Sequence, residues 1–166
     1  MDFEEVYKRN VDTVYRVCFG YLKNVQDTQD AVEDTFVKIL QKPVKFENAE
    51  HEKAFLIKTS ANICKNILKH WSRKNENIED YENLSVNQGF EIDETLQEVL
   101  NLSPKLRSAV YLYYYEGYPT KTIAKLLGTT DTAVRMRLSE ARKQLKANIE
   151  ENNRNFELAL GVTSEN

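Results

Sequence analysis

Apolar residues recur at helical spacing along most of this chain, with polar residues between them. In the first half, such patterns cover residues 3–22, 31–40 and roughly 52–74. A polar stretch at residues 24–30, rich in residues that cap helices, separates the first two patterns. The spacing predicts three helices in this half of the chain.

A second set of helical patterns follows a polar interval. An apolar pattern begins near Leu96, and Ser103 with Pro104 predicts a helix start, because serine caps helices and proline suits the first helical position. We expect this helix to stop near Gly117. Its tyrosines can be interpreted as a stacking platform for bases, but we expect them to fill core and domain-surface positions, as aromatic residues at helical spacing usually do. They are Tyr111, Tyr113, Tyr114 and Tyr115.

Residues 120–146 predict two helices joined by a tight turn. Gly128 tolerates the left-handed backbone that ends a helix, and Thr129 and Thr130 offer hydroxyl caps for the next one. The apolar stripe of the second helix consists of Val134, Leu138, Ala141 and Leu145. A helix-turn-helix places such a second helix in the major groove of DNA. The alternative is a helical hairpin with a solvated basic face, but the small-residue turn and the local cations favour DNA binding.

Charge is distributed unevenly, although the formal net charge of the chain is only −3. Residues 1–74 carry +2, residues 75–101 carry −8 without any lysine or arginine, residues 102–148 carry +6, and residues 149–166 carry −3. This asymmetry indicates two polyanion-binding regions separated by a segment that repels DNA.

Together these patterns predict an all-α protein with two small helical domains joined by an acidic linker. We expect an N-terminal helical domain at residues 1–74, a flexible linker at 75–94, a helix-turn-helix domain at 95–148 and a C-terminal tail at 149–166. The tail is either a short helix that docks on the core or a disordered end.

Acidic residues crowd the first half of the second helix. They are Asp27, Asp30, Glu33 and Asp34. Carboxylates at this end suit the helix dipole, which is one explanation of the cluster. The functional alternative is an acidic, partly apolar docking face for a basic partner, with Phe36 as its anchor.

The third helix is basic outside its apolar face, and Trp71 lies near its basic end. Cations for phosphates and aromatic rings for unstacked bases are what single-stranded or melted DNA requires. An ordinary solvated helix face is the alternative.

Other classes of function find little support in the composition. The chain has 5 glycines and 3 prolines, no apolar run long enough to span a membrane, and no signal-peptide profile at its start. Cys18 and Cys64 match no zinc or disulfide pattern, so we expect two buried thiols in a reducing cytoplasm. His51 and His70 lack catalytic or metal-ligand spacing, and no phosphate-binding glycine loop occurs. We therefore expect no catalytic residues, no metal and no cofactor.

Three motifs in this order resemble the bacterial RNA polymerase sigma factors of the extracytoplasmic-function type. DTQDAVEDTFVKIL (residues 27–40) resembles the polymerase-docking helix of that family. AFLIKTSANICKNILKHWSRK (residues 54–74) resembles its promoter-melting helix, and residues 102–145 resemble its DNA-reading domain. The resemblance covers residues 1 to about 147, and the order of the three motifs is its most specific feature.

The resemblance implies a site for each step of promoter binding. The residues expected to bind the clamp helices of core polymerase are Asp30, Glu33, Asp34 and Phe36. Those expected to hold the non-template strand of the melted promoter are Lys45, Phe46, Phe55, Lys58, Asn62, Lys65, Asn66 and Lys69. Those expected to meet base edges of duplex DNA are Thr132, Ala133, Arg135, Met136, Ser139 and Glu140, and those expected at phosphates are Lys121, Arg137, Arg142 and Lys143.

The resemblance also implies partners and a location. We expect core RNA polymerase, promoter DNA and an anti-sigma factor as partners, with no membrane insertion, in the cytoplasm. The acidic linker is expected to enter a basic channel of the polymerase that RNA later occupies. The alternative function is that of a helix-turn-helix transcriptional regulator that does not bind core polymerase as a sigma subunit.

Overall fold

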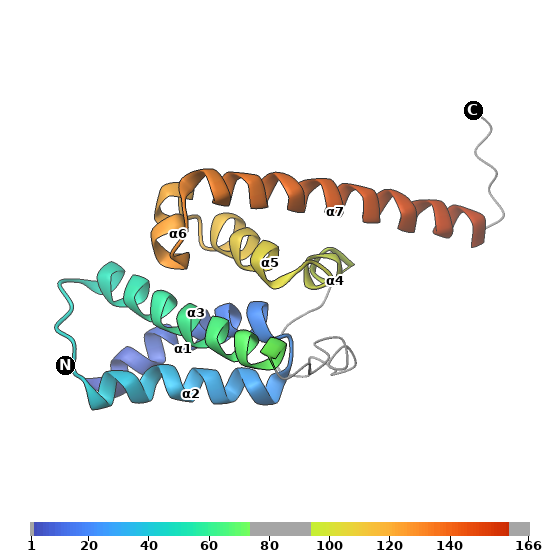
Figure 1. Cartoon of the computed structure of the whole chain (residues 1–166). Coiled ribbons are helices and arrows are strands. Elements are labelled where there is room, and N and C mark those ends of the chain that lie inside the picture. Colours follow the sequence, from blue (N-terminus) through green and yellow to red (C-terminus); the bar gives the residue numbers. More distant parts are fainter. Residues whose placement is uncertain (1, 74–93, 160–166) are drawn as a thin grey trace.

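The computed structural model describes residues 2–73 and 94–159, and every regular element in these stretches is helical. The elements of residues 2–73, which we call the front module, are α1 (Phe3–Leu22), α2 (Val25–Gln41) and α3 (Ala49–Arg73). Those of residues 94–159, the rear module, are α4 (Glu94–Leu100), α5 (Pro104–Val110), the π-helix η2 (Tyr111–Tyr115), α6 (Thr120–Leu127) and α7 (Asp131–Ala159). The expected all-α fold with a helix-turn-helix is confirmed, and the expected linker lies almost wholly outside the described residues (Figure 1).

The front module is a bundle in which α1, α2 and α3 all pack on one another. Their apolar stripes meet in a core that includes Val14, Leu56 and Ala61, each without exposed surface. A polar group also joins α1 to α3. The buried Glu52 carboxylate accepts hydrogen bonds from Arg9 (3.1 and 3.2 Å) and from the Asn10 side chain (2.7 Å). These three hydrogen bonds offset the free-energy cost of removing the charged carboxylate from water.

Helix α2 starts earlier than the polarity of residues 24–30 predicts. Asn24 caps it, since its side-chain oxygen accepts the backbone N–H of Asp27 at 3.1 Å, and the helix begins at Val25. The prediction of a non-helical break at residues 24–30 is therefore wrong for residues 25–30, which are helical. Polar residues in the first turns of a helix satisfy its free N–H groups and suit its dipole, so polarity alone did not mark a loop.

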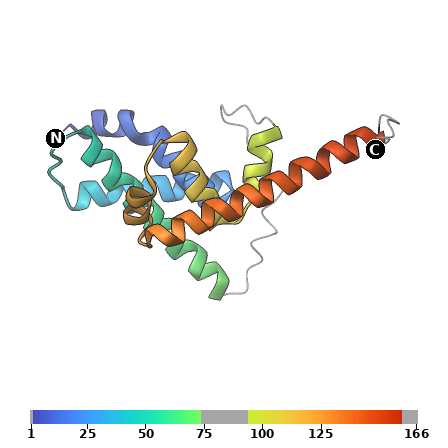
Figure 2. The same ribbon diagram turned by 90° about the horizontal axis from the view of Figure 1, so that it is seen from above.

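The rear module packs α5 and α6 against the first half of α7. Helix α5 continues directly into η2, where the wider turn is closed by the Glu116 N–H bonding the Tyr111 carbonyl at 3.2 Å. Helix α7 does not stop near residue 148 but runs on to Ala159 (Figures 1 and 2). The described part of the expected tail is therefore the end of a long helix.

The two modules are packed together, with α5 against α1 and α6 against α3 (Figure 1). Arg107 of α5 is the central polar contact. Its Nε donates to the Gly20 carbonyl (2.5 Å) and Nη2 to that of Tyr21 (3.3 Å), both near the end of α1. Its Nη1 donates to the carbonyls of Leu100 (3.1 Å) and Leu102 (2.6 Å). Burial lowers the pKa of Arg107 to about 10, so the guanidinium stays charged at neutral pH.

Candidate nucleic-acid and protein interfaces

One face of α2 is exposed along its whole length. Asp30, Glu33 and Asp34 are exposed in its first half, as the docking prediction requires. Val37 and Leu40 are 42% and 54% exposed in its second half. Three carboxylates followed by two aliphatic side chains make a surface that can bind a basic and partly apolar partner. We call this surface the α2 face.

Phe36 does not belong to the α2 face, and its expected role as an exposed anchor is wrong. Its side chain is only 3% exposed. The ring packs edge-on against Phe3, with centroids 6.2 Å apart, and at a tilt of 59° against Tyr7, with centroids 4.8 Å apart. Phe36 falls on the same helical line as the buried Val32 and Ile39, so the exposed apolar positions are Val37 and Leu40, which the sequence prediction missed.

The residues expected to bind melted DNA gather along α3 and the loop before it. Lys45, Lys58, Asn62, Asn66 and Lys69 are exposed, and the four on α3 recur at intervals of three or four residues, which puts them on one face. We call this surface the α3 face. At its start, the half-buried rings of Phe46 and Phe55 meet at 5.5 Å. The structure thus brings cations, amides and two aromatic rings together, as binding of an unpaired strand requires.

Lys65 differs from the other cations of α3 because it contacts the rear module. Its Nζ donates to the Leu127 carbonyl at the end of α6 and lies 3.9 Å from the site where a side chain on Gly128 would begin. Burial, followed by the nearby charge of Arg137, lowers the pKa of Lys65. One lysine that was predicted to bind melted DNA is therefore used in the contact between the two modules.

The turn between α6 and α7 has the predicted helix-turn-helix geometry. Gly128 adopts the left-handed backbone at φ 66° and ψ 41°, and its N–H bonds the Ala124 carbonyl. The Thr130 hydroxyl accepts the Ala133 N–H at 3.1 Å and caps α7. Of the two threonines named from the sequence, Thr130 is the cap.

The start of α7 presents most of the residues predicted to read duplex DNA. The exposed ones are Thr132, Arg135, Met136, Ser139, Glu140, Arg142 and Lys143 on α7 and Lys121 on α6. Ala133 and Arg137 are half-buried. Arg135 forms a 3.1 Å ion pair with Asp131 one turn earlier, which holds its stem along the helix while most of the side chain stays exposed. An exposed helix of this kind after a tight turn can enter a major groove.

The tyrosines of η2 divide between core and surface. Tyr111 and Tyr113 pack against the core, as predicted, whereas Tyr114 and Tyr115 are 54% and 60% exposed. The Tyr114 hydroxyl accepts a hydrogen bond from Arg142 Nε at 2.7 Å, and the same guanidinium lies 5.7 Å from the ring centre. Tyr114 is thus held against α7, and it helps to orient a predicted phosphate contact.

Metal and membrane chemistry find no support in the part of the chain that the structure describes. No group of three or more potential ligand side chains gathers there. None of the helices in those two stretches combines the length and the apolarity needed to cross a bilayer. Cys18 and Cys64 are both buried and free, as expected, and a hydrogen bond with Cys18 together with burial raises the pKa of Cys64.

Comparison with known proteins assigns each module to a described family. The family described as sigma-70 region 2 matches residues 6–77, and that described as sigma-70, region 4 matches residues 92–145. The two matches together cover well over half of the chain and correspond to the front and rear modules.

Curated proteins with similar sequences are also sigma factors. The ECF RNA polymerase sigma factor SigE of Mycolicibacterium smegmatis is 24% identical over 155 residues, which are 87% of this chain but 60% of the relative. The probable RNA polymerase sigma factor RfaY of Xanthomonas campestris matches over only 37% of its own length. The RNA polymerase sigma factor SigV of Bacillus subtilis is 26% identical over 137 residues, covering 80% of this chain and 81% of SigV.

Solved structures share the fold. The sigma factor RpoE from Bartonella quintana, in complex with the anti-sigma factor NepR, superposes with a TM-score of 0.65 at 19% identity, covering 90% of this chain and 97% of that one. CnrH, in complex with the cytosolic domain of CnrY, gives a TM-score of 0.61 at 17% identity over 90% of this chain and 88% of that chain. With regions 2 and 4 both present and in order, this chain belongs to the sigma-70 family, in its extracytoplasmic-function group.

Proposed function

We propose that this chain is an alternative sigma factor, which binds core RNA polymerase and directs promoter-specific initiation of transcription. The observation that carries the proposal is the presence, in one chain and in family order, of sigma regions 2 and 4 with three separate exposed faces. Each face has the chemistry of a different step. We also propose the domain boundaries 1–74, 75–94 and 95–148, each within a few residues of an end of a family match, at residues 77, 92 and 145.

Binding to the polymerase uses the α2 face in this proposal. Asp30, Glu33 and Asp34 supply charge that steers a basic partner, and Val37 and Leu40 supply apolar surface that holds it. Phe36 acts indirectly, because its buried ring fixes α2 against α1.

Melting of the promoter uses the α3 face. Lys45, Lys58 and Lys69 hold phosphates of the non-template strand, while Asn62 and Asn66 offer hydrogen bonds to base edges. Phe46 and Phe55 offer rings against which a displaced base stacks. These contacts replace base stacking that is lost when the duplex opens.

Recognition of the distal promoter element uses α7. Thr132, Arg135, Met136 and Ser139 lie on its exposed side and reach base edges, together with Ala133 and Glu140. Arg142, Lys143, Lys121 and Arg137 hold phosphates and fix the register of the helix on the duplex. Neither DNA site performs covalent chemistry, so we propose a regulatory subunit rather than an enzyme.

We further propose that this chain acts in the cytoplasm and that an anti-sigma factor controls it. The support is the shared fold with RpoE and CnrH, whose structures were solved with NepR and with the cytosolic domain of CnrY.

Run-off transcription tests the proposal directly. Purified chain and core polymerase are incubated with genomic fragments, and transcripts are mapped. Discrete start sites that need both components are expected. A chain that neither binds core polymerase, by native gel or anisotropy, nor supports initiation would refute the function.

A further inference from the structure

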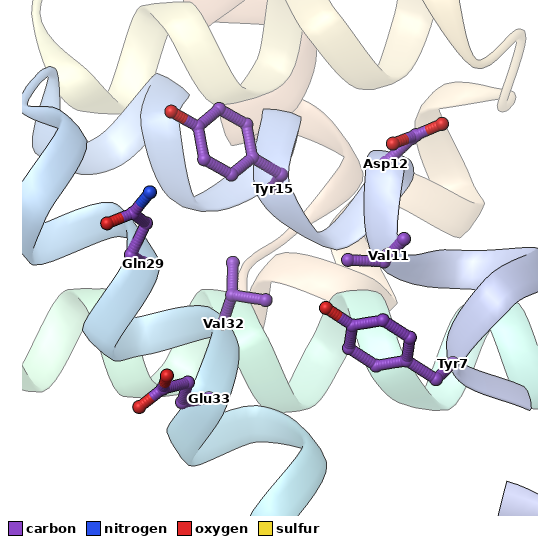
Figure 3. Close-up of a pocket in the computed structure, with 7 residues that line it drawn as sticks. All are labelled: Tyr7, Val11, Asp12, Tyr15, Gln29, Val32 and Glu33. Atoms are coloured by element: carbon purple, nitrogen blue, oxygen red, sulfur yellow. The ribbon is translucent and has the colours of Figure 1, made fainter. Parts of the chain in front are cut away.

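Tyrosine side chains gather at the surface of each module, and the charges beside them differ. In the front module, a groove of about 520 Å³ lies between α1 and α2 (Figure 3). Its lining includes two tyrosines, Tyr7 and Tyr15, and two carboxylates, Asp12 and Glu33, and none of the described residues that line it is a cation. In the rear module, Tyr114 lies beside the cation Arg142. Of the two places, the one in the rear module therefore suits an anionic ligand.

Tyr114 and Arg142 come from different elements of the rear module, and both are exposed. Tyr114 belongs to the π-helix η2 and is 54% exposed, and Arg142 is exposed on α7. Arg142 follows Arg135 by seven residues, close to two full turns, so both lie on one side of α7, about 10 Å apart along its axis. The major groove is about 12 Å wide, so a duplex that receives the start of α7 brings its backbone near Arg142.

The contact between the two side chains leaves donors free on both. Arg142 Nε donates to the Tyr114 hydroxyl oxygen at 2.7 Å. A phenol can accept one hydrogen bond and still donate its own O–H. Among the described residues, no acceptor takes this proton and no carboxylate forms an ion pair with Arg142. The hydroxyl of Tyr114 and the Nη groups of Arg142 therefore remain available to one anion.

The guanidinium is held in position before any ligand arrives. Its central carbon lies 5.7 Å from the ring centre of Tyr114 and 6.0 Å from that of Tyr113. The two rings meet edge-on with centroids 4.9 Å apart, and Tyr113 packs against the core. A long side chain that is already restrained loses less conformational entropy when it binds, so this arrangement favours binding of a ligand.

We propose that Tyr114 and Arg142 bind the same backbone phosphate of promoter duplex DNA. Arg142 donates through its Nη groups and Tyr114 through its hydroxyl, and the non-bridging oxygens of the phosphate accept both. The inference rests on the proposed sigma function and adds η2 to the DNA-binding surface of the rear module. This role differs from the two considered for these tyrosines in the sequence, base stacking and core packing. A phosphate contact fixes register and affinity rather than the choice of bases.

Fluorescence anisotropy of the chain–polymerase complex with a mapped promoter duplex tests the site. Tyr114→Phe keeps the ring and removes the hydroxyl, so binding should weaken about three- to tenfold. The slope of log affinity against log salt should stay unchanged, because a neutral donor releases no counterion, whereas Arg142→Ala should reduce the slope by about 1. A reduced slope for Tyr114→Phe would mean that Tyr114 only holds Arg142, and it would overturn the proposed contact of the hydroxyl.

Tyr115→Phe is the matched control, because Tyr115 is the next residue of η2 and is 60% exposed. Its ring stacks on Tyr111, with centroids 6.0 Å apart, instead of lying beside Arg142. This variant should bind the duplex like the wild type, and thermal melts of all variants verify the fold.

Neutral methylphosphonates, placed one at a time in the duplex backbone, identify the ligand. If both side chains bind one phosphate, there is a single position at which the losses caused by Tyr114→Phe and by Arg142→Ala both shrink. Different positions for the two variants, or no such position for Tyr114→Phe, would overturn the proposal.

The binding results also separate this proposal from the proposed function. A wild-type complex that binds the duplex, with Tyr114→Phe binding equally tightly, overturns the phosphate site and leaves the sigma function standing. A wild-type chain that does not bind core polymerase and supports no initiation overturns both.

Discussion

The two candidate DNA-binding faces differ in what holds their cations. On α7, Arg135 pairs with Asp131 of the same helix and Arg142 with Tyr114 of the same module. On α3, Lys58 and Lys69 are exposed, but Lys65 donates to the Leu127 carbonyl of the other module. The arginines at the start of α7 are thus held by contacts within the rear module, whereas one lysine of α3 is held by a contact with the rear module.

Because of this difference, binding of duplex DNA and binding of an unpaired strand would not affect the contact between the modules equally. In the proposed function, duplex DNA meets the exposed start of α7, where the contacts of Arg135 and Arg142 lie within the rear module. An unpaired strand that runs along all of α3 must replace the hydrogen bond of Lys65. The same interface also brings the charges of Lys65 and Arg137 near each other, which is unfavourable and is offset by the contacts of Arg107 and the shared core.

The largest expected effect comes from removing the cations of the reading helix. In the chain–polymerase complex, Arg135→Ala with Arg137→Ala is expected to weaken binding to a mapped promoter duplex by at least about 30-fold, since each contact of this kind contributes about 1–3 kcal/mol. The slope of log affinity against log salt should fall by about 2. Fluorescence anisotropy over a salt series measures both.

Arg154→Ala is the matched control, because Arg154 is an exposed arginine of the same helix, far beyond the turn. It should bind DNA like the wild type. Equal losses in the control and the double variant would mean that the start of α7 is not the reading surface, and the contrast between the two faces would disappear.

The next largest effect concerns the interface between the two modules. Arg107→Met keeps much of the buried stem but leaves carbonyls of Gly20, Tyr21, Leu100 and Leu102 without their donor. The free energy of unfolding is expected to fall by about 2–4 kcal/mol. Urea denaturation followed by circular dichroism measures it. Lys105→Ala, at an exposed site on the same helix, should change it by less than about 0.5 kcal/mol.

Sequence patterns predicted much of this architecture because local chemistry determines it. The turn at Gly128, the cap at Thr130 and the buried stripe of Val134, Leu138 and Ala141 each follow from spacing and residue type. The basic character of α3 outside its apolar face follows from residue spacing in the same way.

What escaped prediction depends on contacts between distant segments. Arginine is usually exposed, so nothing in the sequence marks Arg107 as buried between modules. The groove at Asp12 likewise needs both helices in place before it exists. Phe36 and Val37 are adjacent apolar residues, and the helical line that Phe36 shares with Val32 and Ile39 could have shown that Phe36 faces inward.

A smaller effect distinguishes two lysines of α3. Lys58→Ala and Lys65→Ala should each weaken binding of single-stranded non-template DNA by the polymerase complex about three- to tenfold. Only Lys65→Ala should also change the unfolding free energy of the free chain, by about 0.5–1.5 kcal/mol, because it loses the hydrogen bond to Leu127. Anisotropy and urea titrations test the pair, and equal stability of the two variants would contradict the proposed engagement of Lys65.

The smallest expected effect is a pH dependence of the contact between modules at Glu116. This carboxylate lies 2.5 Å from Lys53 of α3 and accepts a hydrogen bond from the Tyr111 hydroxyl at 2.5 Å. Burial opposes its charge, but these two partners outweigh burial and lower the pKa of Glu116. A lowered folded-state pKa means that the contribution to stability is complete above the unfolded value of about 4.5 and is lost as the pH falls through the lower folded value.

Urea unfolding of the wild type and of Glu116→Gln between pH 7 and pH 3 measures this contribution. The difference should be within about 1 kcal/mol near neutrality, which is the net contribution of a typical intramolecular hydrogen bond, and should shrink below pH 4.5. Glu140→Gln, an exposed site on α7, should show no such pH-dependent difference. A gap for Glu116→Gln that stays constant down to pH 3 would mean that the charge of Glu116 does not join the modules, and Arg107 and the shared core would then carry the interface without it.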